Sequence, residues 1–359
     1  MKRQDTHVVA LGNITVGGES PVSIEAMGRS HPAHIQKTLR EIRRSVREGC
    51  EIFRLAVPDR EALEGLKILH PKSPLPLIAD IHFIPELAWD AVRAGIDGVR
   101  INPGTFRNQE KYINLVEMLK DSQTVLRLGA NAGSLPAALQ KESRVKALFE
   151  IIATYLEVPR KKNFHRVILS AKSSDIEETI ETNHLLSEAF PYPLHIGLTE
   201  AGEGEEGIIK STLGVGILLR EEIGNTIRIS LTSNDPVLET RAASILLKTL
   251  GLKNEGIEII SCPTCARKMG DVVSLVRILK KKLARYKVNR NIRIAVMGCE
   301  VNGPGEAREA DFGLALAKGT AVLFSHGKVI GTVHRDRAID VFLDHFNTFF
   351  PAGEPRCRE

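Results

Sequence analysis

Three cysteines and one glutamate are the residues of this chain most suited to holding a metal cofactor. Cys262 and Cys265 lie in Ser-Cys-Pro-Thr-Cys-Ala, and Cys299 lies in Met-Gly-Cys-Glu-Val-Asn-Gly-Pro-Gly-Glu, seven residues before Glu306. Each segment follows a β-branched run that predicts a strand, so the thiols are expected at strand ends. Three thiolates can hold a soft metal site and leave a fourth position for a ligand other than sulfur. The pattern favours an iron–sulfur cluster with one iron available for chemistry.

Other uses of these cysteines stay open on the residues alone. A single Cys-x-x-Cys pair is equally typical of half a zinc ribbon or of a thioredoxin-like redox pair. The redox interpretation does not account for Cys299, and a structural zinc would need a fourth ligand such as His326 or His334. The proline beside Cys262 and the glycine-rich approach to Glu306 favour the iron–sulfur interpretation. Glu306 could alternatively be a solvated carboxylate at the start of a helix.

Charged side chains on one face of several predicted strands form a second group. In Thr-Ile-Arg-Ile-Ser-Leu-Thr (226–232), Arg228 and Ser230 alternate with apolar residues. Alternate residues of a strand point to opposite faces, and in a parallel barrel the apolar face must meet the helices, so Arg228 is expected to point inward. The same alternation places five cations inside: Arg54, Arg100, Arg127, Lys172 and Arg228.

These inward cations outnumber the acids that the same strands supply. Only Asp80 and the strand-end Glu200 oppose them, which leaves about three positive charges without partners. Unpaired buried charge is costly, so the interior is expected to bind a multiply charged anion, and arginine forks match phosphate oxygens. One arginine alone could extend its head into solvent, but five strands share the pattern. Asp80 and His82 could instead be a zinc pair, although no third ligand is evident.

The elements that must position these residues are predicted strands and helices that alternate from about Pro21 to Gly251. Eight strand–helix units fit a (β/α)₈ barrel better than an open sheet, and the pocket is then expected at the carboxyl ends of the strands. The segment His7 to Gly18 predicts a hairpin that plugs the barrel base. Strands are predicted at 22–28, 52–57, 75–81, 98–102, 124–131, 166–172, 193–200 and 225–232.

The regular alternation of strands and helices ends after Gly251, and the pattern that follows predicts a second, smaller α+β domain. Its elements are expected to be a strand at 257–262, a helix at 268–284, a strand at 292–299, a hairpin within 311–333 and a helix near 336–350. The expected domains are therefore a substrate-binding barrel at 1–251 and a cysteine-bearing, cluster-binding domain at 252–359.

Composition limits the class of protein further. A chain of 359 residues with 43% hydrophobic residues can form a barrel plus a smaller domain. A net charge of +5 with 5% aromatic residues argues against nucleic-acid binding. Neither an export signal nor a run of transmembrane length is found, so no membrane association and a cytoplasmic location are expected. Among the remaining cysteines, Cys50 is expected to be a buried apolar residue and Cys357 to lie in a frayed tail.

Eight motifs, in order along the chain, resemble those of the bacterial 4-hydroxy-3-methylbut-2-enyl diphosphate synthase family. The resemblance covers nearly the whole chain and includes both cysteine segments. Any one motif could arise by chance, whereas eight in the same order are highly specific. They are Arg-Leu-Ala-Val-Pro-Asp (54–59), Ala-Asp-Ile-His-Phe (79–83), Arg-Ile-Asn-Pro-Gly (100–104), Asn-Ala-Gly-Ser-Leu (131–135), Gly-Leu-Thr-Glu-Ala-Gly (197–202), Ile-Arg-Ile-Ser-Leu-Thr (227–232), Cys-Pro-Thr-Cys (262–265) and Gly-Cys-x-Val-Asn-Gly-Pro-Gly-Glu (298–306).

The resemblance implies a (β/α)₈ barrel followed by a small iron–sulfur domain. It implies a head-to-tail homodimer in which the cluster domain of one chain covers the barrel mouth of the other. The implied substrate is 2-C-methyl-D-erythritol 2,4-cyclodiphosphate, whose diphosphate would be the anion that the cations require. The implied reaction is reductive opening of the ring with loss of water, by two electrons delivered one at a time from flavodoxin or ferredoxin.

The resemblance also implies roles for individual residues. Glu200 would give or take a proton, and Cys262, Cys265, Cys299 and Glu306 would hold a [4Fe–4S] cluster. A carboxylate is a harder and more labile iron ligand than a thiolate, so Glu306 would be the ligand that leaves to admit the substrate. The substrate would be bound by Arg54, Arg100, Arg127, Asn131, Lys172, Arg228 and Ser230.

Two loops depart from the family pattern. Met27-Gly28-Arg29-Ser30 stands where the family usually carries a Met-Thr-Asn-Thr type segment, and Thr105-Phe106-Arg107 stands in place of Asn-Ile-Gly. The large middle domain of plant-type members is absent, as in the short bacterial form.

The predicted helix 268–284 and the residues after it carry many basic side chains. Such a run is typical of a solvated helix face, but it could also form a docking surface for an acidic flavodoxin or ferredoxin. Two other classes of function remain to be compared: a zinc-dependent barrel lyase or pterin-type transferase, and a non-catalytic iron–sulfur sensor. The basic set comprises Arg277, Lys280, Lys281, Lys282, Arg285, Lys287 and Arg290.

Overall fold

The chain divides into two compact units, Met1–Lys253 and Asn254–Glu359. The computed structural model describes residues 2–136, 143–253, 255–286, 288, 290–299 and 309–351. Each unit has a hydrophobic core of its own. Within those ranges, no helix is both long and apolar enough to cross a membrane.

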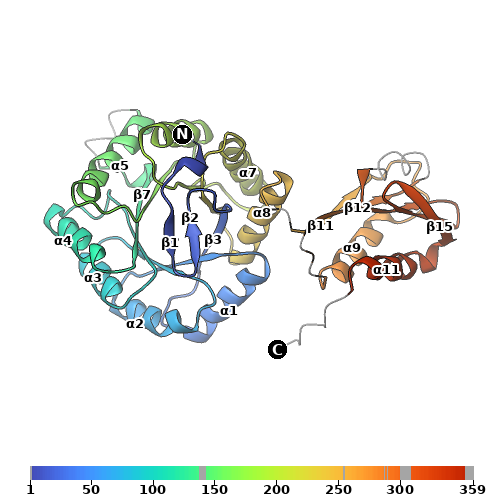
Figure 1. Cartoon of the computed structure of the whole chain (residues 1–359), viewed down its shortest axis with the longest axis horizontal. Helices are drawn as coiled ribbons and strands as arrows, with labels where there is room; N and C mark the ends of the chain where they lie inside the picture. The colour runs from blue at the N-terminus through green and yellow to red at the C-terminus, as the bar shows by residue number, and fades with distance from the viewer. Residues whose placement is uncertain are drawn as a thin grey trace. The chain divides into compact units, whose positions relative to one another are not determined.

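The first unit is an eight-stranded parallel barrel, as predicted (Figure 1). Its strands are hydrogen-bonded in the order β8-β7-β6-β5-β4-β3-β10-β9. A parallel bridge from Leu169 of β8 to Leu194, the residue before β9, closes the barrel. The strands are β3 (Ser23–Met27), β4 (Ile52–Ala56), β5 (Leu77–Ile81), β6 (Gly98–Ile101), β7 (Val125–Asn131), β8 (Val167–Lys172), β9 (His195–Ile196) and β10 (Thr226–Ile227).

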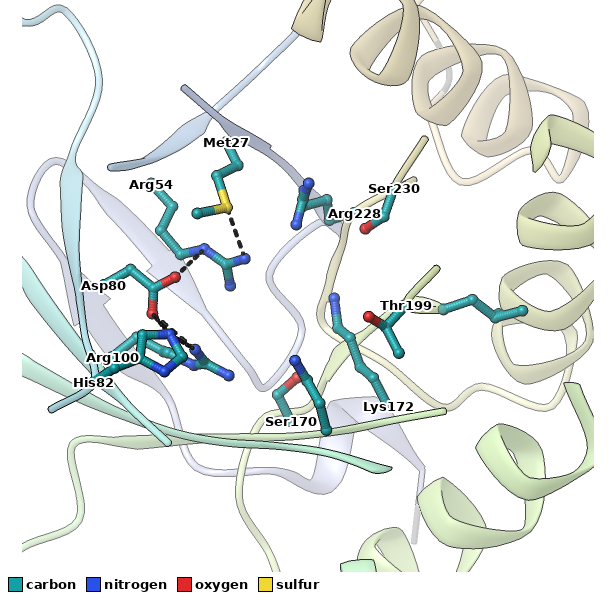
Figure 2. A pocket seen from close by; sticks show the side chains of 12 residues that line it. Met27, Arg54, Asp80, His82, Arg100, Ser170, Lys172, Thr199, Arg228 and Ser230 are labelled. Atoms are coloured by element: carbon teal, nitrogen blue, oxygen red, sulfur yellow. Dashed lines mark hydrogen bonds and ion pairs between the residues drawn. The ribbon is translucent and has the colours of Figure 1, made fainter. Parts of the chain in front are cut away.

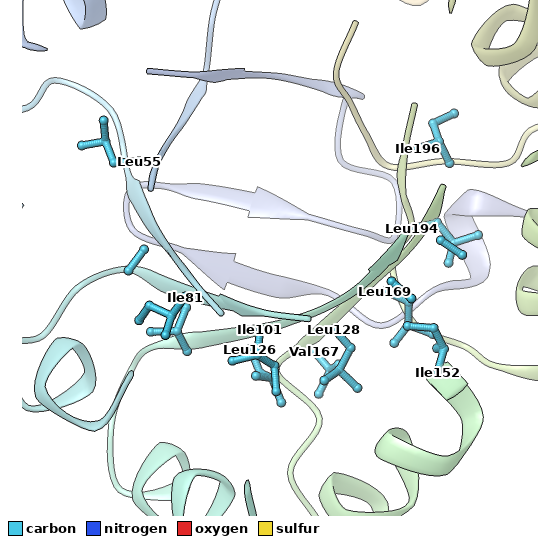
Figure 3. Packing of buried hydrophobic residues seen from close by; sticks show 14 of the residues in the cluster. Leu55, Ile81, Ile101, Leu126, Leu128, Ile152, Val167, Leu169, Leu194 and Ile196 are labelled. Atoms are coloured by element: carbon cyan, nitrogen blue, oxygen red, sulfur yellow. The ribbon is translucent and has the colours of Figure 1, made fainter. Parts of the chain in front are cut away.

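Helices surround the strands and cover their outward-facing apolar side chains (Figure 1). Leu55, Ile101 and Leu169 are among the fully buried residues of this layer (Figure 3). Several helices begin where an Asp or Asn side chain accepts a hydrogen bond from the first turn, as Asp235 does from the backbone N–H of Val237. The helices are α1 (Ile35–Arg47), α2 (Arg60–Leu69), α3 (Pro85–Arg93), α4 (Gln109–Lys120), α5 (Arg144–Lys161), α6 (Ile176–Ala189), α7 (Gly204–Arg220) and α8 (Pro236–Thr249), with short 3₁₀ turns η1 (Arg3–Asp5), η2 (His70–Lys72) and η3 (Ala132–Ser134).

A hairpin of β1 (Val9–Leu11) and β2 (Ile14–Val16) closes one end of the barrel. Leu11 and Val16 are fully buried against inward-facing residues of the strands, including Ile52 and Ile168. Apolar side chains therefore fill the base, and the predicted plug is confirmed.

The last two barrel strands are much shorter than the predicted 193–200 and 225–232. The regular ladder ends after two residues in β9 (His195–Ile196) and in β10 (Thr226–Ile227). At Gly197 the neighbouring backbone approaches so closely that a Cβ would lie 2.4 Å from the carbonyl oxygen of Arg228. The segments that follow both strands leave the ladder, and Leu198, Thr199, Arg228 and Ser230 line the mouth instead.

The described residues of the second unit form a five-stranded mixed sheet with two helices. Its strands are hydrogen-bonded in the order β11-β12-β13-β14-β15, parallel as far as β13 and antiparallel beyond it. The main helix begins at Val272 rather than at 268, because Asp271 caps it and the preceding residues form a loop. The elements are β11 (Gly256–Ser261), α9 (Val272–Leu283), β12 (Asn291–Met297), β13 (Phe312–Leu316), β14 (Thr320–Ser325), β15 (Lys328–His334), η6 (Arg335–Arg337) and α11 (Ala338–Phe349).

Candidate active site at the barrel mouth

A polar cavity of about 220 Å³ lies at the carboxyl ends of the barrel strands. Arg54 of β4, Lys172 at the end of β8 and Arg228 just after β10 point toward the same space (Figure 2). This is the end of a (β/α)₈ barrel at which active sites are found. The cavity is lined by Met27, Arg54, Asp80, His82, Arg100, Asn131, Ser170, Lys172, Leu198, Thr199, Arg228 and Ser230.

Asp80 organises one wall of the cavity. Arg100 Nη1 donates to Asp80 Oδ1 at 2.8 Å, and Arg54 Nε lies 3.7 Å from Asp80 Oδ2. Burial alone would raise the pKa of Asp80, but Arg100, Arg54 and His82 together hold it well below its usual value. The carboxylate is therefore charged and fixes both guanidinium groups in place.

The Asp80 and His82 pair is not arranged as a zinc site. Arg100 Nη1 lies 2.9 Å from His82 Nε2 while it also contacts Asp80, so a guanidinium occupies the place between the two side chains. Among the described residues, no group of three or more His, Cys, Asp or Glu side chains is arranged to hold a metal ion. The zinc alternative at this position is therefore not supported.

Lys172 carries its amino group into the cavity from the end of β8. Its Nζ lies 3.0 Å from His195 Nε2, and His195 Nδ1 lies 2.8 Å from Thr226 Oγ1. Burial, followed by the charges of Arg228 and Arg54, holds the pKa of Lys172 well below its ordinary value. Burial and the nearby cations lower the pKa of His195 as well, so the imidazole is neutral and can accept a hydrogen bond from the amine.

Glu25 lies beneath the cavity and was not identified from the sequence. Its carboxylate is fully buried, contacts Arg127, and lies 3.5 Å from Arg54 and 3.6 Å from His195. Burial raises the pKa of Glu25, but Arg127, Arg54 and Lys172 outweigh it and lower the pKa overall. The signal was available: Glu25 alternates with Ile24 and Ala26 in a predicted strand.

Arg127 occupies a different layer from the other predicted substrate-binding cations. Its side chain is 1% exposed and contacts Glu25, and it is not among the residues that line the cavity. Arg54, Arg100, Lys172 and Arg228 do line it, together with Asn131 and Ser230. The structure thus brings six of the seven predicted residues to one cavity, with Arg127 below them.

Glu239 on α8 is a second buried acid that sequence reasoning missed. It is 1% exposed, and one of its oxygens lies 3.6 Å from Arg228 Nη2 while the other accepts from Arg29 Nη2 at 2.6 Å. An acid in the first turns of a helix is common, so nothing in the sequence singles out Glu239. Its contacts with Arg29 and Arg228 are apparent only in the three-dimensional structure.

Positive charge remains in excess around the cavity. The five predicted cations and Arg29 face three buried carboxylates, those of Glu25, Asp80 and Glu239. Three positive charges are left over, or two when Lys172 is neutral. The excess matches the expectation from the sequence in size, but two of the balancing acids differ from those expected. A cavity with this balance suits an anion that carries about two negative charges.

Glu200 sits at the mouth but does not line the cavity. The residue is exposed and has a left-handed backbone, with φ of 52°. A Cβ placed on Gly133 of η3 would lie 3.8 Å from Glu200 Oε1, which places the carboxylate beside that turn. A proton-transfer role therefore requires the substrate or the loop to bring reacting atoms to Glu200.

The two loops that depart from the family pattern are built into the mouth. Thr105 Oγ1 lies 3.2 Å from His82 Nδ1, and Phe106 is buried at 1% exposure. At the other loop, a Cβ on Gly28 would lie 2.6 Å from Leu55 Cδ2, so only glycine fits without displacement. The backbone N–H of Arg29 donates to Glu41 Oε2 at 3.0 Å, which anchors the turn to α1.

The cysteine segments meet in the second unit. Cys262 follows β11, and Cys299 follows β12, its parallel neighbour. The backbone N–H of Gly298 donates to Cys262 Sγ at 3.2 Å, so the segments touch. Cys265 is exposed and Cys299 is buried. Glu306, the fourth predicted ligand, lies outside the described residues, as does Cys357, whereas Cys50 is buried as expected and its pKa is raised to about 12 by burial.

Three thiols are the donors that a soft metal cluster takes, although Cys262, Cys265 and Cys299 are not gathered into a ligand group in the described residues. A Cβ on Gly298 would lie 3.1 Å from Cys262 Sγ and 2.8 Å from Val272 Cγ2, so the glycine is required for the backbone to approach the sulfur. Backbone N–H donation to sulfur is one of the interactions that tune iron–sulfur clusters. Thr264, between the two cysteines, adopts a left-handed φ of 56° that turns the Cys-Pro-Thr-Cys segment.

Fold and site together define a class of protein with two domains. The first is a barrel with a cationic mouth, and the second carries two adjacent cysteine segments. The GcpE TIM-barrel domain model matches residues 6–244, and the GcpE protein C-terminal domain model matches residues 258–348. The chain belongs to the GcpE family, which confirms the family expected from the motifs.

Named relatives match along nearly their whole length. The 4-hydroxy-3-methylbut-2-en-1-yl diphosphate synthase (flavodoxin) of Lawsonia intracellularis is 42% identical over 96% of this chain and 96% of its own. Proteins of the same name from Thermodesulfovibrio yellowstonii and Aquifex aeolicus are 40% and 41% identical, over 96% of this chain and over 99% and 96% of theirs.

Proposed function

We propose that this protein converts 2-C-methyl-D-erythritol 2,4-cyclodiphosphate into 4-hydroxy-3-methylbut-2-enyl diphosphate, by reductive opening of the ring with loss of water, in non-mevalonate isoprenoid biosynthesis. The observation that carries the proposal is family membership across both domains, with relatives of that name at about 40% identity over 96% of the chain. The cationic cavity supplies independent support, because its excess of charge suits a cyclic diphosphate.

The residues around the cavity would bind and orient the diphosphate. Each phosphoryl group of a cyclic diphosphate has one strongly acidic oxygen, so the substrate is a dianion at neutral pH, and the two or three positive charges left over in the cavity are enough to balance it. Arginine forks bind such oxygens in pairs, and Lys172 adds a point charge. The proposed set is Arg54, Arg100, Asn131, Lys172, Arg228 and Ser230 at the cavity, with Arg127 supporting them from below through Glu25.

Glu200 and the cysteines would serve the chemical step. Glu200 would supply or receive a proton at its exposed carboxylate, at the rim of the mouth. Cys262, Cys265, Cys299 and Glu306 would hold a [4Fe–4S] cluster. When bound, such a cluster would supply electrons to the substrate one at a time. The close approach of Gly298 to Cys262 would hold that thiolate in place.

We also propose that a second copy of the chain completes the active site. In a head-to-tail dimer, the cysteine domain of one chain would cover the barrel mouth of its partner. An apolar groove of about 350 Å³ between α7 and α8 supports an interface on the barrel, since Ile209, Leu213 and Ile245 beside it are more than half exposed. Light scattering should then give twice the chain mass of 39.5 kDa.

The proposed electron donor is a flavodoxin or a ferredoxin, and α9 offers a surface for it. Lys282 pairs with Asp340 at 3.2 Å and Arg290 with Asp311 at 2.9 Å, so these two cations of the predicted basic set already have partners. Lys287 lies outside the described residues. Arg285 is exposed and lies over the ring of Tyr286, 5.3 Å from its centroid. The exposed cations Arg277, Lys280, Lys281 and Arg285 remain as the candidate docking surface, which an acidic donor would complement.

Charge reversal separates docking from chemistry. Lys280→Glu with Lys281→Glu should weaken turnover driven by reduced flavodoxin at low salt by roughly tenfold, because surface charges act mainly on association. Turnover driven by dithionite should be unchanged. The matched control is Lys72→Glu with Lys248→Glu, the same charge change at exposed barrel positions. Equal flavodoxin-driven rates for both variants would exclude this surface.

Anaerobic purification followed by a single assay tests the proposed function. The protein should be brown, contain iron, and convert the cyclodiphosphate into the linear diphosphate when a reductant is present, as read by phosphorus NMR. A colourless protein that contains zinc would point instead to a barrel lyase or transferase. A brown protein that leaves the cyclodiphosphate unchanged with every reductant would point to a sensor.

A further inference from the structure

A buried carboxylate at the mouth is shared unequally by two arginines. Glu239 of α8 is 1% exposed and lies between Arg29, from the loop after β3, and Arg228, from the segment after β10. Its Oε1 accepts from Arg29 Nη2 at 2.6 Å and from the backbone N–H of Leu231 at 2.7 Å. The distance from its Oε2 to Arg228 Nη2 is 3.6 Å, which is too long for a hydrogen bond.

Arg29 is fixed by more than this one contact. Its Nε donates to the carbonyl oxygen of Ser233 at 3.1 Å, and its Nη2 also donates to that of Leu231 at 3.2 Å. Its own backbone N–H is held by Glu41. The guanidinium therefore bridges the loop after β3 to the loop before α8 and lies against one face of the Glu239 carboxylate.

Arg228 is left with unused hydrogen-bonding capacity in the wall of the cavity. Its Nε and the Oε2 of Glu239 are both buried and have no hydrogen-bond partner among the described residues. Arg228 lines the cavity (Figure 2), whereas Arg29 does not. A buried guanidinium next to a buried carboxylate would ordinarily close onto it as a charge-assisted pair.

We propose that Arg29 is a positioning residue, which holds Glu239 away from Arg228 so that Arg228 stays available to the diphosphate. This inference rests on the proposed function only for the identity of the anion. Arg29 would act through Glu239 without touching the substrate. It would also explain why this chain tolerates an arginine in one of the two loops that depart from the family pattern.

The affinity of the holoenzyme for two anions tests this role. Arg29→Gln should let Arg228 pair with Glu239, and affinity for the cyclodiphosphate should fall roughly tenfold or more, the effect of one charge-assisted hydrogen bond. In the dithionite assay KM should rise while kcat changes little. Inorganic pyrophosphate, measured by calorimetry, serves as a second probe. If the wild type binds pyrophosphate but never converts the cyclodiphosphate, the proposed function fails while the Arg29 inference is still tested.

Three further variants separate positioning from loss of structure. Arg29→Gln combined with Glu239→Gln removes the competing carboxylate and should restore affinity to within about threefold of the wild type. Arg29→Lys should retain part of the affinity, and it keeps the test valid if Arg29→Gln does not fold. Arg44→Gln is the matched control, because Arg44 joins α1 to Asp235 at the start of α8 without contacting Glu239. Unchanged affinity in both single variants at Arg29, or a double variant weaker than Arg29→Gln, would overturn the proposal.

Discussion

Replacing Glu25 by glutamine should destabilise the barrel strongly although it removes no atoms from the core. Glu25 contacts the buried Arg127 and lies 3.5 Å from Arg54. Removing one partner of a buried ion pair costs about 3–5 kcal/mol, because the other charge is left uncompensated. Glutamine keeps the shape and one acceptor oxygen, and Arg54 keeps Asp80, so we expect the lower end of that range, about 3 kcal/mol.

Urea denaturation followed through the single tryptophan measures this effect. Trp89 lies on α3 and packs against the barrel core, so its fluorescence follows the barrel and not the cysteine domain. The control is Glu64→Gln, which breaks an exposed pair with Lys67 and should change the free energy of unfolding by less than about 1 kcal/mol. If Glu25→Gln changes the free energy of unfolding no more than this control, the buried ion pairs of Glu25 do not stabilise the barrel.

Two further predictions concern the cavity and the cysteine domain. Because the pKa of Lys172 is held well below its ordinary value in the free protein, a bound dianion should raise it. Binding should then take up protons, and affinity should fall as pH rises through the interval between the pKa of Lys172 in the free protein and its pKa in the complex. Calorimetry in buffers of different ionisation enthalpy measures this uptake, which Lys172→Met should abolish; uptake that persists in the variant would assign the proton elsewhere. Gly298→Ala would place a Cβ 3.1 Å from Cys262 Sγ and should lower the bound iron, whereas Gly331→Ala, at a position with nothing within 4 Å, should not. Equal iron in the two variants would contradict the close approach at Gly298.

The barrel and most of its cavity could be predicted because strand periodicity carries direct information. Alternation with apolar residues placed Arg54, Arg100, Lys172 and Arg228 inside, and all four line the cavity. The same alternation along Ser23–Met27 predicts that Glu25 points inward. Glu25 was missed because the alternation was examined only in strands that carry cations.

Other features depend on contacts that no local pattern encodes. Glu239 comes from a helix, and its partners Arg29 and Arg228 are distant in sequence. The regular ladder of β9 and β10 ends early beside the close approach of the Arg228 backbone to Gly197, an arrangement that depends on how the strands are placed. Helix α9 begins at Val272 because Asp271 caps it, although the apolar stripe of the helix allowed an earlier start.

Electron paramagnetic resonance of the dithionite-reduced holoenzyme, with and without the cyclodiphosphate, tests the central claim most directly. We expect the signal of a reduced [4Fe–4S] cluster that changes when the cyclodiphosphate is added, with more cyclodiphosphate required in Arg29→Gln. A protein without an iron–sulfur signal, or a signal that saturating cyclodiphosphate leaves unchanged, would contradict the claim that the barrel mouth presents this substrate to a cluster held by Cys262, Cys265 and Cys299.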